Sequence, residues 1–162
     1  MICQDAIEKR VFPILLRHKG NAYLTLYYDT KRSDAVLHCQ GKILYFQSMA
    51  EMQRFCQEKG LEMQNDTVVY DFDAPIQNPI DYKQVLHRWN LLDTIADTLG
   101  MYFEGDGDRY TAVYDLLFRA YISATPIPPT WRLREKDYRY VLRVFRKQDR
   151  FFRRFVLFTN QL

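Results

Sequence analysis

The segment "NPIDYKQVLHRWNLLDTIADTLG", residues 78–100, stands between a strand-rich first half of the sequence and a helical second half. Its apolar side chains recur every three or four positions, which predicts a helix with one buried face. They are Val85, Trp89, Leu92, Ile95, Ala96 and Leu99. Asn78 and Pro79 suit the start of a helix, and Gly100 suits its end. We therefore predict one helix over residues 78–100, with Asp93 and Asp97 on its polar face.

The residues before this helix predict strands and one shorter helix. The runs 11–18 and 22–29 flank "KGN", and the runs 35–40 and 42–47 flank Gly41, which predicts two hairpins. Pro13 favours an edge strand, a bulge or a short helix in the first run. Ser48 and Glu51 form a capping box and Gly60 is a stop signal, so residues 48–60 predict a helix. Residues 67–73 predict a fifth strand.

The residues after the central helix predict further helices. The segment "TAVYDLLFRAYI", residues 111–122, predicts a short helix that "ATPIPPT" ends. Residues 137–158 leave two readings open: one long helix, which we favour, or a hairpin that turns at "KQD". The predicted fold class is α+β: a single domain, residues 1–162, in which an antiparallel sheet from the N-terminal half packs against C-terminal helices.

Length and composition limit the class of protein. The chain of 162 residues fits one domain, and it contains no apolar run long enough to cross a membrane. Its first ten residues carry acids where a signal peptide would carry bases. The three cysteines are scattered, which indicates reduced thiols. We therefore expect a cytoplasmic protein that does not associate with membranes.

The net charge of +3 conceals two segments of opposite charge. Residues 62–115 contain eleven acids and three bases, whereas residues 132–154 contain ten bases and three acids. Such asymmetry in a small chain indicates a charged partner, or two surfaces that neutralise each other.

The acidic stretch "MYFEGDGDRY", residues 101–110, resembles a calcium loop in the alternation of its acids. The match fails at Arg109, which occupies the position where an EF-hand loop needs glycine, and no second loop is present. The histidines and cysteines lack the spacing of a zinc site. No motif of nucleophilic catalysis or nucleotide binding occurs. We therefore predict no metal, no cofactor and no enzymatic activity, and keep an enzyme of unknown class as a further alternative.

Two surfaces are candidates for partner binding. The first combines acids with aromatic side chains at a strand end and a loop tip, where binding residues concentrate. Its members are Asp71, Asp73, Tyr102, Glu104, Asp106 and Asp108. The second is a stripe of arginines that a single C-terminal helix would place on one side, as a nucleic-acid-binding surface does. Its members are Arg139, Arg143, Arg146, Arg150 and Arg153.

The block from "TVVYDFD" to "LLFRAY", residues 67–121, resembles the small cytoplasmic immunity proteins of bacterial contact-dependent growth inhibition and related polymorphic-toxin systems. The resemblance lies in an acidic, aromatic-rich middle of a small α+β protein. It implies an antitoxin that binds one cognate toxin, often a nuclease, and occludes its basic active-site cleft. This is the predicted function, and an RNA- or DNA-binding protein is the alternative.

Overall fold

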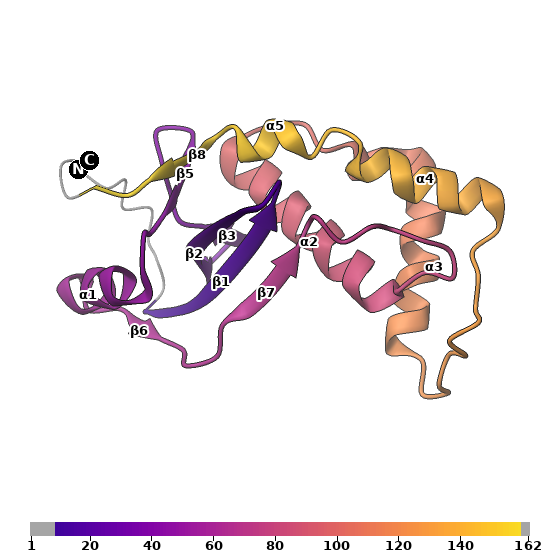
Figure 1. Ribbon diagram of the computed structural model, residues 1–162, viewed down its shortest axis with the longest axis horizontal. Helices are drawn as coiled ribbons and strands as arrows, with labels where there is room; N and C mark the ends of the chain where they lie inside the picture. The colour runs from indigo at the N-terminus through magenta and orange to yellow at the C-terminus, as the bar shows by residue number, and fades with distance from the viewer. Residues whose placement is uncertain (1–8, 160–162) are drawn as a thin grey trace.

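A computed structural model describes residues 9–159 of the chain (Figure 1). The strands are β1 (Arg10–His18), β2 (Asn21–Asp29), β3 (Asp34–Val36), β4 (His38–Cys39), β5 (Lys42–Tyr45), β6 (Glu62–Met63), β7 (Val68–Asp71) and β8 (Phe155–Leu157). The helices are α1 (Met49–Lys59), α2 (Tyr82–Leu99), α3 (Thr111–Ile122), α4 (Glu135–Phe145) and α5 (Asp149–Phe152), with two short 3₁₀ turns, η1 (Glu104–Asp106) and η2 (Asp108–Tyr110). The predicted α+β class is confirmed.

The first sheet has the strand order β3-β2-β1-β6, and β7 also pairs with β1. The predicted hairpin of β1 and β2 turns at Lys19 and Gly20, whose φ angles are 50° and 74°. The predicted antiparallel pairing holds for β1, β2 and β3, whereas β6 and β7 run parallel to β1, so the sheet is mixed. A parallel pair needs a long crossover connection, and the residues between β2 and β6, which include α1, supply it.

Pro13 lies inside the sheet in a continuous register with β2, so none of the three alternatives predicted for this run, an edge strand, a bulge or a short helix, describes it. It is opposite Leu26 of β2 on one side. On the other side the pairing with β6 ends at Val11, and the pairing with β7 begins at Ile14. Proline has no backbone N–H to donate. Pro13 therefore occupies the gap between two partner strands, where no ladder hydrogen bond is lost.

The second sheet has the order β4-β5-β8. The predicted hairpin around Gly41 exists, but its first run is divided between β3 in the first sheet and β4 in the second. Residues 137–158 form neither one helix nor a hairpin, because they divide into α4, α5 and β8. Residues 155–157 are aromatic or apolar, which suits a strand, and they pair in parallel with β5. Pairing with the edge of β5 therefore makes residues 155–157 a strand, although the periodicity of the segment predicted a helix.

Helix α2 runs through the middle of the molecule, with the sheets on one side and α3 and α4 on the other (Figure 1). It ends at Gly100, as predicted, but its N-cap is Asp81, whose side chain accepts a hydrogen bond from Gln84 N. The predicted cap, Asn78, instead exchanges two hydrogen bonds with the backbone of Leu133, at 2.9 and 3.1 Å. The Asn78 side chain, which the local pattern predicted as the helix cap, therefore binds a residue far away in the sequence instead.

Helices α1 and α3 match their predictions closely. Ser48 caps α1 by accepting a hydrogen bond from Glu51 N, and α3 covers residues 111–122. Cys39 and Cys56 are free and buried, and Cys3 lies outside the described residues. Over residues 9–159, no helix combines the length and the apolar character that crossing a membrane requires.

Candidate functional site

The predicted binding residues at the end of β7 hold the fold together. The carboxylate of Asp73 accepts hydrogen bonds from the backbone N–H groups of Lys19, at 2.5 Å, and Gly20, at 3.0 Å. Asp71 accepts from the N–H groups of Asp73 and Ala74 in its own turn. The backbone hydrogen bonds lower the pKa of the Asp73 carboxyl group. Asp73 therefore joins the end of β7 to the turn between β1 and β2, and Asp71 holds the turn that carries Asp73.

Arg88 of α2 completes this region from the inside. Its guanidinium donates hydrogen bonds to the carbonyl oxygens of Ala74, at 2.9 Å, and Phe72, at 3.3 Å. It lies between the rings of Phe72 and Phe145, at 5.3 and 5.0 Å from their centres. Burial lowers its pKa to about 10, which leaves it charged at neutral pH. We refer to Asp71, Asp73 and Arg88 together as the strand-end network.

The loop 101–110 distributes its acids among different neighbours. Glu104 accepts a hydrogen bond from the buried Tyr110 hydroxyl group at 2.6 Å. Asp106 and Asp108 are both exposed, and Asp106 lies against α2, beside Asp93 and Asp97. The side chain of Tyr102 is 62% exposed, and its ring lies 6.0 Å from the Arg150 guanidinium. The five acids of the predicted surface therefore do not form one patch.

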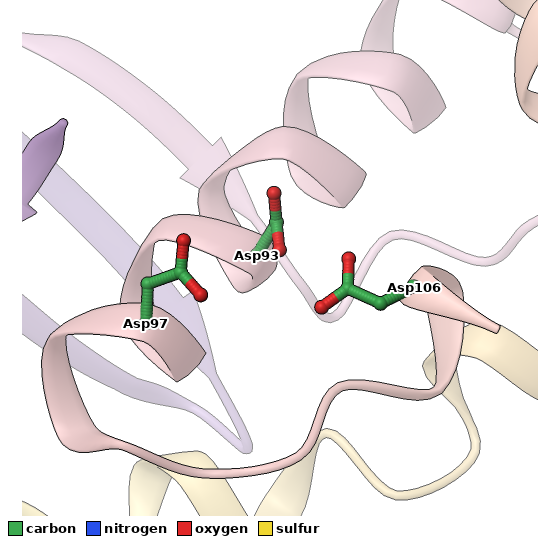
Figure 2. Close-up of side chains that lie close together, drawn as sticks. All are labelled: Asp93, Asp97 and Asp106. Carbon is green, nitrogen blue, oxygen red and sulfur yellow. The ribbon is translucent and has the colours of Figure 1, made fainter.

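Three aspartates do meet, and two of them were missing from the predicted site. Asp93 and Asp97 lie one turn apart on α2, and Asp106 approaches them from η1 (Figure 2). Each offers a carboxylate oxygen within 4.8 Å of the other two. We call these three residues the acidic cluster. The sequence placed Asp93 and Asp97 on the polar face of this helix, but it carried no signal that Asp106 would fold onto them.

Gly105 allows the loop to approach α2 closely. A Cβ atom at this position would lie 2.7 Å from Trp89 Nε1 and 2.5 Å from Phe103 Cε1, which is too close for any side chain. Trp89 and Phe103 are themselves buried and pack edge to face. The glycine between Glu104 and Asp106 thus places the Asp106 carboxylate beside α2.

The acidic cluster is electrostatically unbalanced. The pKa of Asp93 is raised to about 7, first by burial, then by a hydrogen bond to Asp106 and by the charges of Asp106 and Asp97. Asp93 therefore keeps its proton to a higher pH than an ordinary aspartate does. Within the part of the chain that the structure describes, no basic side chain forms an ion pair with any of the three.

The cluster offers oxygen ligands of the kind that hard cations prefer. Ca²⁺ takes six to eight oxygen ligands and Mg²⁺ takes six, so three carboxylates fill only part of either shell. A cation here would keep several water ligands. A protonated or positively charged group from a partner needs fewer ligands and fits the same three oxygens.

A cleft extends from the cluster along α2. Two pockets of about 440 and 320 Å³ adjoin at Asn90, Asp93 and Tyr114, whose hydroxyl group donates to Asn90 Oδ1 at 2.8 Å. The remaining lining residues are Tyr27, Asp34, Tyr70, His87, Trp89, Leu91, Thr94, Gly105, Asp106 and Thr111. This α2 cleft combines carboxylates with aromatic rings, which is the combination predicted for the binding surface, at a different place in the fold.

The predicted arginine stripe is divided, because its helix is broken after Phe145. Arg139, Arg143 and Arg146 are exposed along α4 and just after it, and Arg139 pairs with Glu135 at 3.1 Å. Arg150 on α5 donates a hydrogen bond to the carbonyl oxygen of Tyr102, and Arg153 lies between α5 and β8. The five arginines therefore do not share one helix face.

The fold resembles a solved structure, the C-terminal domain of SatS in complex with bromine. The two chains are 16% identical, with a TM-score of 0.62, and the match covers 91% of this chain and 94% of that chain. No protein-family model and no curated protein matches the sequence. At this identity the likeness concerns the fold alone.

Proposed function

We propose that this chain is a non-enzymatic binding protein, an immunity protein that neutralises a cognate toxin by covering basic groups of the toxin with the α2 cleft. The observation that carries the proposal is the acidic cluster. Three carboxylates lie within 4.8 Å of one another, and no cation of the described chain is paired with them. A lysine or arginine side chain of a partner would supply the missing positive charge.

The surroundings of the cluster suit a protein partner. Tyr27, Tyr70 and Tyr114 line the cleft beside Asp93, and tyrosine is enriched where protein interfaces gain most of their affinity. Tyr70 is half-buried, as is Tyr27, so each ring is already held by the fold. Rings held in this way lose little conformational entropy when a partner binds. Charge attraction at the cluster would also accelerate association with a basic toxin.

The test is binding to the toxin domain encoded by the neighbouring gene, measured by calorimetry, together with protection of cells that express this toxin. We expect the variant Asp97→Lys/Asp106→Lys to weaken binding at least a hundredfold, because it places positive charges against a basic surface. Both residues are exposed, so the fold should persist.

The matched control is Glu58→Lys with Glu62→Lys, which makes the same charge change on α1 and β6. It should bind the toxin within a few fold of the unmodified protein. Equal affinity of the two double variants would reject the α2 cleft as the binding surface. Absence of any toxin domain that binds the unmodified chain would reject the immunity function itself.

A further inference from the structure

A second charged pocket lies where the loop 101–110 meets α4 instead of α2. Arg109 and Tyr110 contribute from η2, and Glu104 from η1. Three bases at the C-terminal end of α4 complete the wall. Arg143 lies in the last turn of the helix, and Arg146 and Lys147 follow it directly. The pocket has a volume of about 290 Å³. We call it the basic pocket, and its chemistry is independent of the toxin-binding proposal.

The positive charges of the basic pocket are not balanced from within the chain. Four bases surround one carboxylate, Glu104, and this carboxylate already accepts the hydrogen bond from the Tyr110 hydroxyl group at 2.6 Å. Across residues 9–159, none of the four bases forms an ion pair. The pocket therefore has about three positive charges in excess.

The hydrogen bond between Tyr110 and Glu104 lies in the wall of the basic pocket. Tyr110 is 1% exposed, and Arg109 and Arg143 line the same pocket beside it. The Arg143 guanidinium also lies over the Tyr140 ring, 5.6 Å from its centre. This ring contact helps to hold Arg143 at the pocket before any ligand binds.

Stabilisation of the end of α4 is the competing explanation for these bases. Cations near the C-terminus of a helix interact favourably with its partial negative charge, which accounts for Arg143, Arg146 and Lys147. It does not account for Arg109, which comes from a separate segment and converges on the same pocket. Convergence of bases from two segments is what recognition of an anion requires.

We propose that the basic pocket binds a phosphate group with two negative charges, as in a phosphomonoester or a pyrophosphate. The planar fork of an arginine pairs with two oxygens of a phosphate group at once, and two arginines can hold one phosphate from different sides. A terminal phosphate carries close to two charges near neutral pH, which matches the excess of the pocket better than a singly charged phosphodiester does. The source is a free small phosphate compound or the phosphorylated end of a nucleic acid strand.

The experiment is titration calorimetry at constant ionic strength with pyrophosphate and with a short single-stranded DNA in two forms, one 5′-phosphorylated and one 5′-hydroxylated. We expect Arg109→Gln/Arg146→Gln to weaken pyrophosphate binding about tenfold or more. The control Arg32→Gln/Arg54→Gln removes two exposed bases elsewhere and should leave the affinity unchanged. Equal losses in the two double variants would overturn the proposal, because the effect would then be one of net charge.

The two DNA forms distinguish the source of the phosphate. If the phosphorylated strand binds more tightly than pyrophosphate and than the hydroxylated strand, the ligand is a strand end. If pyrophosphate binds at least as tightly as the phosphorylated strand, the ligand is a small phosphate compound. If the two strands bind equally and pyrophosphate does not compete with them, the arginines contact the phosphodiester backbone diffusely and the proposal is wrong.

Discussion

Asp73 and Asp93 both lie in the acidic middle of the sequence, and the pKa values of their carboxyl groups move in opposite directions. Asp73 accepts two backbone hydrogen bonds in the strand-end network, which lowers its pKa. Asp93 lies half-buried beside two other carboxylates, which raises its pKa to about 7. The first carboxylate is already used to hold two turns together. The second has no partner of opposite charge among residues 9–159, and it is therefore the one that an external partner can stabilise.

The largest effect is expected when the buried positive charge of Arg88 is removed from the strand-end network. Arg88 is 2% exposed, so the variant Arg88→Met keeps much of the volume but removes the Arg88 donor from the carbonyl oxygen of Ala74 and leaves that of Phe72 with Gln148 Nε2 alone. We expect the free energy of unfolding to fall by about 3 kcal/mol. Urea denaturation measures it. Arg54→Met on α1, where the arginine is exposed, should change it by less than about 0.5 kcal/mol.

The second test removes the charge of Asp93 from the acidic cluster. We expect it to raise the free energy of unfolding, whereas Arg88→Met lowers it. Because Asp93 holds its proton up to about pH 7 in the folded protein, the unfolded chain ionises first as the pH rises. The unmodified protein therefore loses stability between about pH 4 and pH 7 through this group. Asp93→Asn cannot ionise, so it should be more stable than the unmodified protein by about 1–2 kcal/mol at about pH 8, after allowance for solvent screening of a half-exposed group.

The same pair of proteins provides the control for this second test. At about pH 4 most of the advantage of Asp93→Asn should be lost, because the folded unmodified protein is then protonated at this position and the unfolded chain is about half protonated. Urea denaturation at the two pH values gives the comparison. A constant difference at both pH values would mean that the effect is one of packing and that the carboxylates are not in conflict.

The smallest expected effect concerns Asp73 itself. Asp73→Asn keeps one oxygen acceptor for the turn of Lys19 and Gly20 but loses the charge, so the melting temperature should fall near neutral pH. Because the folded-state pKa of Asp73 is lowered, its contribution exists above the ordinary carboxyl pKa and is lost as the pH falls through the lowered value. The melting curves of the two proteins should therefore converge in acid. Convergence at high pH instead would contradict the strand-end network.

Local signals in the sequence were enough for the elements that depend on neighbouring residues. The hairpin at Lys19 and Gly20, the capping box at Ser48 and the end of α2 at Gly100 all rest on side chains or backbone angles within a few positions. Asn78 was assigned wrongly because its preferred partner is Leu133, which lies in another part of the chain. The prediction of one long C-terminal helix was wrong because of another distant contact: residues 155–157 pair with β5.

The candidate site shows the same limit. Asp106 was predicted as a binding residue from the composition of its loop, and Asp93 was placed on the polar face of its helix. Neither pattern shows that the two would meet, because the meeting depends on the approach that Gly105 permits beside Trp89. The type of surface, acidic and aromatic, was thus accessible from the sequence, whereas its position required the fold.

The parallel pairing of β8 with β5 determines when the second sheet can form during synthesis. Ile43 is opposite Phe155, and Phe158 N donates to the carbonyl oxygen of Tyr45 at 2.7 Å, so the strand closes a loop that spans most of the chain. A nascent chain emerges from the ribosome with β4 and β5 first, and the edge of β5 stays open until β8 is made. An open edge of this kind pairs readily with another chain. We therefore expect a chain in which β8 has not yet been made to expose this edge of β5 to pairing with other chains.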